Sequence, residues 1–275
     1  TFANAIAYVE SAIKKGMDPN KFGPRISFFF NSHNGFLEEI SKFRAARKLW
    51  ANIMKNRFSV TNEKALYCRF HVQTGGSTLT AQQIDNNIAR TTIQALSAVL
   101  GGAQSLHTNS KDEALSLPSE ESAQTALRTQ QILAYESGVP NYPDPLGGSY
   151  LIEELTNDFF NNSLKKIKEI DAIGGAIEAI NIGYIQNEIS ESAYQYQKEL
   201  ESNKNIVVGV NKFENKENKI ENLLDIDQKK VDLQIKDLIL YKNSRNNNQV
   251  KATLENLKLT ASSNKNIMPD IIHCV

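Results

Sequence analysis

Polar and apolar side chains alternate along residues 66–74, and a pair of glycines follows directly at 75–76. Successive side chains of a strand point to opposite faces of the sheet, so this alternation predicts a strand with two unlike faces. The polar face carries Arg69, His71 and Gln73, and the apolar face carries Cys68, Phe70 and Val72.

A strand that is covered by helices in an α/β protein is usually apolar on both faces, and a filled barrel packs branched residues in its interior. A row of polar side chains therefore indicates a strand that faces either solvent or a ligand-filled interior. Taken by itself, the strand is more consistent with a face exposed to solvent. The neighbouring segments favour a ligand-filled interior instead.

Helical and strand-like patterns alternate through the first half of the chain. Apolar residues at helical spacing predict helices over residues 1–15, 35–58, 80–100, 123–137, 150–170, 185–200, 229–240 and 246–259, and a capping-box pattern opens another helix at 110–113. β-prone stretches predict strands over 25–31, 66–74, 103–109 and 206–210. This order is typical of parallel strands joined by right-handed crossovers, with too few strands to close a barrel.

The same periodicity predicts which helix faces are buried. In helix 35–58 the expected buried stripe is Phe36, Ile40, Phe43, Ala46, Leu49, Trp50 and Ile53, with Arg44, Arg47 and Lys48 on the solvated face. In helix 80–100 the expected inward residues are Ile88, Thr92, Ala95, Leu96 and Val99. On strand 25–31, Arg25 and Ser27 share a face, whereas Gln104 and His107 share one only if their strand ends or bulges between them.

Composition narrows the class of protein. The chain has 275 residues, 40% of them hydrophobic, with 31 basic and 31 acidic side chains, so no overall charge favours nucleic acid or an acidic membrane. Cys68 and Cys274 lack the spacing of a metal site or disulfide framework, which fits the cytoplasm or, in a eukaryote, the mitochondrial matrix. No apolar run or leader predicts a membrane segment. The sequence starts inside a helical pattern and stops on an apolar run with no helix-ending signal, so we expect it to be a piece of a longer protein.

Ligand residues of a (β/α)8 barrel come from the carboxyl ends of the strands and the loops beyond them. Gln73, residues 74–77 and residues 112–113 fall at such positions. This agreement favours a ligand-lined interior over a solvated strand.

A set of motifs resembles one family, the large subunit of coenzyme B12-dependent acyl-CoA mutases, or methylmalonyl-CoA mutase family. The resemblance covers residues 1 to about 213, and its motifs are 24–29 (PRISFF), 44–47 (RAAR), 69–74 (RFHVQT), 76–83 (GSTLTAQQ), 86–92 (NNIARTT), 104–114 (QSLHTNSKDEA), 144–149 (DPLGGS) and 208–212 (VGVNK). Each motif is weak alone, but their order and spacing are specific.

The resemblance implies an α/β fold: the C-terminal portion of a (β/α)8 TIM barrel, followed by a mainly helical linker. Residues 1–150 would belong to the acyl-CoA-binding barrel, 151–213 to its helical extension, and 214–275 to a linker toward a cobalamin-binding domain. Earlier barrel strands would carry the catalytic histidine and the residues that recognise the acyl group. The cobalamin-ligand motif Asp-x-His-x-x-Gly does not occur in this sequence.

The resemblance also implies roles for individual residues. Arg25 and Ser27 would contact the phosphate and pantetheine of CoA, and Arg69, His71 and Gln104 would line the substrate channel. Adenosylcobalamin, which brings its own cobalt, would be met by Gln73, Glu113, Ala114 and Leu117. No metal ligand and no catalytic residue is expected in this part of the barrel.

The implied activity is the radical 1,2-rearrangement of an acyl-CoA, with (R)-methylmalonyl-CoA to succinyl-CoA as the leading reaction. The alternatives are isobutyryl-CoA mutase, a non-catalytic partner subunit, and an unrelated barrel enzyme with a polar interior. Expected partners are an acyl-CoA, a cobalamin-binding domain or small subunit, and a second chain in a dimer or heterodimer. This segment by itself is expected to be inactive.

The residues alone leave other roles open. Arg69 is equally consistent with a surface arginine, His71 and His107 with structural histidines, and Glu113 with a carboxylate that complements a helix dipole.

Overall fold

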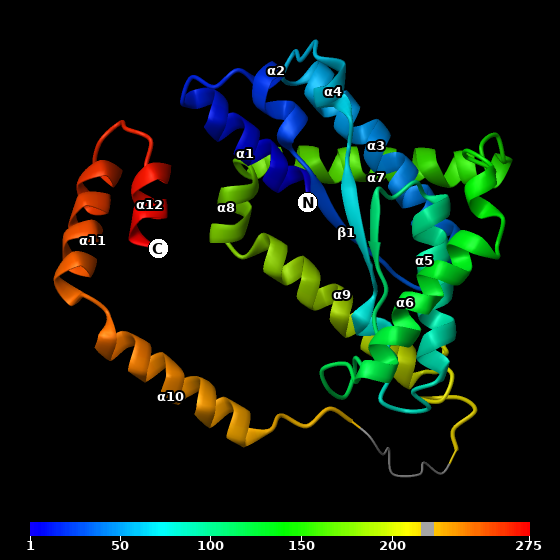
Figure 1. The fold of residues 1–275 in the computed structure, drawn as a ribbon. Helices are drawn as coiled ribbons and strands as arrows, with labels where there is room; N and C mark the ends of the chain where they lie inside the picture. The colour runs from blue at the N-terminus through cyan, green and yellow to red at the C-terminus, as the bar shows by residue number, and fades with distance from the viewer. Residues whose placement is uncertain (216–222) are drawn as a thin grey trace. The chain divides into compact units, whose positions relative to one another are not determined.

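The computed structural model describes residues 1–215 and 223–275 (Figure 1). The chain divides into two compact units, Thr1–Leu224 and Asp225–Val275. The first unit holds the sheet and the packed core. In the second unit, helices α10 (Gln228–Ser244), α11 (Asn247–Ala261) and α12 (Met268–Cys274) bury no residue fully among those described.

A three-stranded parallel sheet is the centre of the first unit. Its strands lie in the order β1 (Phe28–Ser32), β2 (Phe70–Thr74) and β3 (Ser105–His107). Helix α3 (Phe36–Asn56) connects the first two strands, and α5 (Asn86–Leu100) connects the last two (Figure 1). The predicted alternation of helices with parallel strands is confirmed.

The remaining helices of this unit surround the sheet. They are α1 (Phe2–Lys14), α2 (Pro19–Phe22), α4 (Glu63–Leu66), α6 (Glu120–Tyr135), α7 (Tyr150–Ile173), α8 (Ala176–Asn181) and α9 (Tyr184–Glu201). Short 3-10 turns cover Gly23–Arg25, Gly76–Thr78 and Val139–Asn141. The longer helices match their predicted positions, whereas α2, α4, α8 and α12 were not predicted, because so few residues show no clear helical period. None of the described helices is long and apolar enough to cross a membrane.

The core forms where α3 covers the even-numbered face of the sheet. The rings of Phe43 and Phe70 stack with centroids 5.4 Å apart, and Trp50 meets Phe28 edge-on at 4.8 Å. These contacts keep the aromatic surface away from water. The predicted buried stripe of α3 is confirmed except at Phe36, which is only partly buried.

Helix α5 buries a different face from the one predicted. Of the expected inward residues only Ala95 is fully buried, and the buried face consists of Asn87, Thr91, Gln94, Ala95, Ser97 and Ala98. Asn87, Gln94 and Ser97 form side-chain hydrogen bonds with the strand ends and loops beside them, whereas the Thr91 hydroxyl has no partner among the described residues. Ser32 Oγ, for example, lies 2.8 Å from Ser97 Oγ and donates to the carbonyl oxygen of Gln94. A hydrophobicity pattern does not register a face whose burial depends on such hydrogen bonds.

Two of the basic residues predicted on the solvated face of α3 are partly buried instead. Arg44 forms ion pairs with Asp144 and with Glu153, the latter at 2.7 Å, and these contacts raise its pKa, with the hydrogen bond to Asp144 as the main cause. Arg47 donates to the carbonyl oxygen of Gly101, and burial lowers its pKa. Lys48 is exposed, as predicted.

The strand predicted over 66–74 begins later than expected: β2 starts at Phe70 because residues 63–66 form α4, so Cys68 and Arg69 lie just before the strand. Three other local predictions were wrong. Strand β1 begins at Phe28, so Arg25 lies in the preceding 3-10 turn and Ser27 in the extended residues after it. Residues 110–113 form turns rather than a helix, because the Asp112 carboxylate accepts the backbone N–H of Ser119 and folds the chain back.

The third wrong prediction is the strand at 206–210. Among the described residues this segment has no neighbouring strand to pair with, and it turns at Gly209, whose φ of +83° favours glycine. It makes a single isolated bridge between Val208 and Lys212. Arg90 of α5 donates to the carbonyl oxygen of Val208 at 2.7 Å, which holds the loop against that helix.

Candidate functional site

The face of the sheet opposite the core is polar, and we call it the polar face. The register of the strands places its residues in two rows, Phe29–His71–Ser105 and Asn31–Gln73–His107. Side chains in register on adjacent parallel strands project to the same side of the sheet. The predicted alternation along β2 is confirmed, because Phe70 is 2% exposed and Val72 0%, while His71 and Gln73 are half-buried.

The first row is held by contacts between its side chains. His71 Nδ1 lies 2.7 Å from Ser105 Oγ, and the His71 and Phe29 rings have centroids 5.0 Å apart. Ser105 was not named by the sequence reasoning, although its alternation with His107 places it on this face. The same alternation resolves the open question about strand 103–109: Ser105 and His107 share the polar face, and Gln104 lies before the strand.

The amino end of the sheet gathers most of the residues expected to bind substrate. Ser27 and Arg69 are neighbours in the ladder, since Phe28 N donates to the Arg69 carbonyl oxygen at 2.8 Å. Gln104 is beside them, because its Oε1 accepts Phe70 N at 2.6 Å. Arg25 lies in the turn that leads into β1. Arg25 and Arg69 are exposed and form no ion pair within residues 1–215 and 223–275.

The carboxyl end of the sheet holds a tighter group, which we call the carboxyl-end cluster: Gln73, Gly76, Asn109 and Glu113. Gln73 Nε2 donates to Asn109 Oδ1 at 3.0 Å. A Cβ added at Gly76 would lie 2.7 Å from Asn109 Nδ2 and 3.3 Å from Glu113 Oε1. A side chain at position 76 would therefore require the Asn109 amide to move.

Asn109 is the member of the cluster that sequence reasoning missed as a site residue. It is 2% exposed, and its Nδ2 has no hydrogen-bond partner among the residues the structure describes. A buried donor is normally satisfied, so this unpaired donor marks Asn109 as a candidate contact for a ligand acceptor. The sequence did offer a signal for Asn109, because it directly follows a predicted strand and lies within the 104–114 motif.

The structure excludes one of the two interpretations of Glu113, the one in which it complements a helix dipole. Residues 111–115 form turns, and α6 begins only at Glu120. Glu113 therefore does not complement a helix dipole. Its carboxylate is exposed at the edge of the cluster, with Ala114 and Leu117 also exposed just beyond it, Leu117 at 62%.

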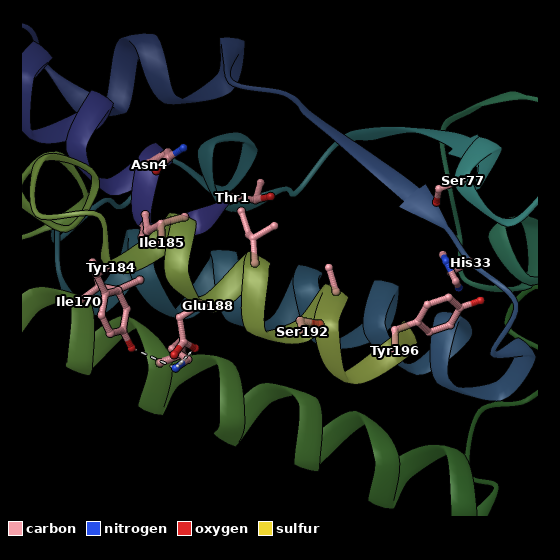
Figure 2. Close-up of a pocket in the computed structure, with 14 residues that line it drawn as sticks. Thr1, Asn4, His33, Ser77, Ile170, Tyr184, Ile185, Glu188, Ser192 and Tyr196 are labelled. Atoms are coloured by element: carbon pink, nitrogen blue, oxygen red, sulfur yellow. Dashed lines mark hydrogen bonds and ion pairs between the residues drawn. The ribbon is translucent and has the colours of Figure 1, made fainter. Parts of the chain in front are cut away.

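A cavity of about 890 Å³ lies between α1, α7 and α9 and reaches His33 and Ser77, in the loops after β1 and β2 (Figure 2). Figure 2 shows Tyr196 of α9 directed toward His33 at one end of this cavity. Lys166 of α7 donates to Glu188 of α9 at 2.7 Å at the other end. Within the described residues β1 pairs only with β2, so its other edge is open.

Two kinds of chemistry have no support among the described residues. No group of three or more His, Cys, Asp or Glu side chains is placed to hold a metal ion. Cys68 is buried, and burial raises the pKa of its thiol to about 12, so it is protonated at neutral pH and is a poor nucleophile.

Comparison with known proteins places the chain in a family of mutases. The family profile described as methylmalonyl-CoA mutase matches residues 1–275, and the chain belongs to this family.

Named relatives are about two fifths identical to this chain over the aligned residues. The 2-hydroxyisobutanoyl-CoA mutase large subunit of Aquincola tertiaricarbonis is 43% identical over 277 residues, which cover 100% of this chain and 49% of the relative. The probable mitochondrial methylmalonyl-CoA mutase of Caenorhabditis elegans is 42% identical, covering 98% of this chain and 36% of its own length. The methylmalonyl-CoA mutase of Rhizobium meliloti (strain 1021) is 40% identical, covering 96% and 37%.

The chain thus spans about half, or less, of the relatives it matches. The family resemblance expected from the motifs is confirmed, and these relatives are mutases by name, which makes them isomerases.

Proposed function

We propose that this chain is part of an adenosylcobalamin-dependent mutase that isomerises an acyl-CoA by a radical 1,2-rearrangement. The observation that carries the proposal is the order of groups along the polar face. Arginine side chains lie at its amino end, the His71–Ser105 pair in the middle, and the carboxyl-end cluster at the other end. This order fits a long thioester whose anionic and reacting ends differ in chemistry.

The amino end has the chemistry to hold the CoA portion. A guanidinium presents a planar set of donors that match phosphate oxygens, and no carboxylate in the described part of the chain competes for Arg25 or Arg69. Ser27 and Gln104 supply neutral polar groups suited to the amides of pantetheine. The Gln104 amide already donates to the Gly102 carbonyl oxygen and accepts from Phe70 N, so it still offers its second N–H and one lone pair.

The carboxyl-end cluster fits an adenosyl group by its donors and acceptors. The exposed Glu113 carboxylate accepts hydrogen bonds from ribose hydroxyls, and the unpaired Nδ2 of Asn109 donates one. Gly76 leaves room for the approach. When bound, the cofactor supplies the carbon radical that begins the rearrangement, and the protein positions it and excludes water.

A closed barrel would convert the polar face into an interior. We propose that further strands pair with the open edge of β1 beside the cavity of Figure 2, which completes a (β/α)8 barrel around the polar face. An unpaired edge next to apolar side chains is a site for such addition. The catalytic histidine and the residues that select the acyl group would then lie on those strands, and a cobalamin-binding domain or small subunit would cover the carboxyl end.

Methylmalonyl-CoA is the leading substrate, because most of the matched relatives carry that name. A second candidate is 2-hydroxyisobutanoyl-CoA, because the 43% identical relative acts on it by name. That relative is a large subunit, which supports a heterodimer with a small cobalamin-binding subunit.

The test is a binding and activity measurement on the full-length protein with its cobalamin-binding partner. Saturable binding of an acyl-CoA and of adenosylcobalamin, followed by conversion of one of these thioesters to its isomer in an assay by NMR, is expected. Saturable binding without conversion would indicate the non-catalytic partner subunit instead. Absence of saturable thioester binding would contradict the proposal.

A further inference from the structure

Gln94 of α5 is fully buried and makes three side-chain hydrogen bonds. Its Oε1 accepts Gly75 N at 2.8 Å. Its Nε2 donates to Asn34 Oδ1 and to Thr78 Oγ1, both at 2.7 Å. A primary amide has two N–H donors and a carbonyl acceptor, so this side chain uses all three functions inside the protein.

The partners of Gln94 belong to the loops that follow two adjacent strands. Asn34 comes after β1, and Gly75 and Thr78 bracket the turn after β2. Thr78 Oγ1 also donates to the Gly75 carbonyl oxygen at 2.6 Å, which closes the turn on itself. One side chain therefore ties both loops to α5 at the carboxyl end of the sheet.

The position of this turn decides the geometry of the carboxyl-end cluster. Gly76 lies between Gly75 and Thr78 and has no free space toward Asn109, since even a methyl group there would approach Asn109 Nδ2 to 2.7 Å. A small shift of the turn would displace the side chains that surround Gly76. This close spacing around Gly76 links the turn that Gln94 holds to the side chains of Asn109 and Glu113.

We propose that Gln94 is a positioning residue, which holds the Gly75–Thr78 turn so that the carboxyl-end cluster has the spacing that its ligand needs. Gln94 touches no ligand itself. The inference rests on the proposed function for the identity of that ligand, adenosylcobalamin, but not for the effect of Gln94 on the turn.

Two variants of Gln94 distinguish the hydrogen bond that its side chain accepts from the two that it donates. Gln94→Leu keeps an apolar side chain of similar size and removes every bond, which leaves the buried Gly75 N–H without an acceptor. Gln94→Glu keeps an oxygen for Gly75 N–H and removes the two donors. The matched control is Thr91→Val: Thr91 is also buried on α5, one turn earlier, and its hydroxyl has no partner among the described residues.

The first measurement is amide hydrogen exchange in the full-length protein, read at Gly75. Gln94→Leu is expected to raise its exchange at least about tenfold, the factor that corresponds to about 1.4 kcal/mol. Gln94→Glu should retain most of the protection, and Thr91→Val should equal the wild type. This measurement does not depend on the proposed function, and unchanged exchange in Gln94→Leu would overturn the inference.

The second measurement compares the dissociation constants for adenosylcobalamin and for an acyl-CoA in the assembled protein. Gln94→Leu should weaken cobalamin binding about tenfold with acyl-CoA binding within about twofold, and Gln94→Glu should be intermediate. Faster exchange with unchanged cobalamin affinity would overturn the link between turn and cluster. If the wild type itself binds no adenosylcobalamin, the proposed function fails, while the exchange measurement still decides the role of Gln94. Should Gln94→Leu not fold, Gln94→Glu, which loses the bonds to Asn34 and Thr78, is used in the second measurement, and an adenosylcobalamin dissociation constant equal to that of the wild type would overturn the inference.

Discussion

The two faces of the sheet differ although the same strands make both. On one face Phe28, Phe70 and Val72 pack under α3 and lose nearly all contact with water. On the other face His71 and Gln73 remain half-buried and bond to polar groups of β3 and the loop after it. The first face supplies stability through apolar burial, and the second supplies groups that a ligand can bind. Substitutions on the two faces should therefore have separable effects.

Phe70→Ala should have the largest effect on stability. Its ring is 2% exposed and packs against Phe43 and Phe30, so its removal leaves a cavity in the core and lowers the free energy of unfolding by about 3–5 kcal/mol. Urea denaturation measures the change. The matched control on the polar face is His71→Ala, with an expected loss below about 1 kcal/mol. Equal losses would remove the distinction between the faces.

Glu113→Ala should act on the ligand and leave stability unchanged. The exposed carboxylate contributes charged hydrogen bonds to the proposed cofactor, so its loss should weaken adenosylcobalamin binding by about 1.5–3 kcal/mol and leave acyl-CoA binding nearly unchanged. Spectroscopic titration of the assembled protein measures both affinities. Glu154→Ala, at an exposed position of α7, is the control and should change neither. Equal weakening of both ligands in Glu113→Ala would contradict the assigned role.

Arg25→Ala should show the reverse selectivity at the other end of the sheet. Loss of one exposed guanidinium should weaken acyl-CoA binding about tenfold at low salt, with cobalamin affinity unaffected. The difference from the wild type should shrink with a thioester of CoA that lacks its 3′-phosphate. The exposed Lys21→Ala serves as the control for charge alone, and an Arg25→Ala protein that binds acyl-CoA normally would refute the contact.

Ionisation of the Cys68 thiol should have the smallest effect on the free energy of unfolding. Measuring it tests whether water is excluded from the apolar face. Burial raises the pKa of its thiol from 9.0 to about 12, so the folded protein keeps the proton at a pH where the unfolded chain loses it. Its contribution to stability is complete below pH 9 and declines between pH 9 and 12, by about 0.8 kcal/mol at pH 9.5 relative to Cys68→Ala. Denaturation at several pH values measures this.

Thiol labelling at pH 8 gives a direct check on the same residue. The partly exposed Cys274 should react at once, and Cys68 only after denaturant is added. Rapid reaction of both thiols would show that the apolar face is open to water.

The comparison between α3 and α5 shows which features of a helix hydrophobic periodicity can predict. Both helices were located from their periodicity, but the buried face was correct only for α3, where Phe43, Leu49 and Trp50 enter an apolar core. Helix α5 buries Gln94 and Ser97 instead, because loops from β1 and β2 supply partners for them. Partners distant in sequence give no local signal, so the burial of Gln94 beside the proposed site was not predicted.

The candidate site likewise has features that the sequence predicted and features that only the structure revealed. Motifs and alternation identified Arg69, His71, Gln73 and Glu113 as candidates, and their roles in binding remain predictions. The alignment of His71 with Ser105 and of Gln73 with His107, and the unpaired donor of Asn109, became visible only in the tertiary structure.

Local order in this protein follows from its sequence alone: the positions of the long helices, the two unlike faces of β2 and the glycines that end it are all properties of neighbouring residues. Tertiary structure decided which polar groups are buried and what they bond to, including the rotation of α5, the turns at 110–113 and the loop at Val208. The physical reason is that a buried polar group is stable only when a partner meets it, and most of these partners lie far along the chain.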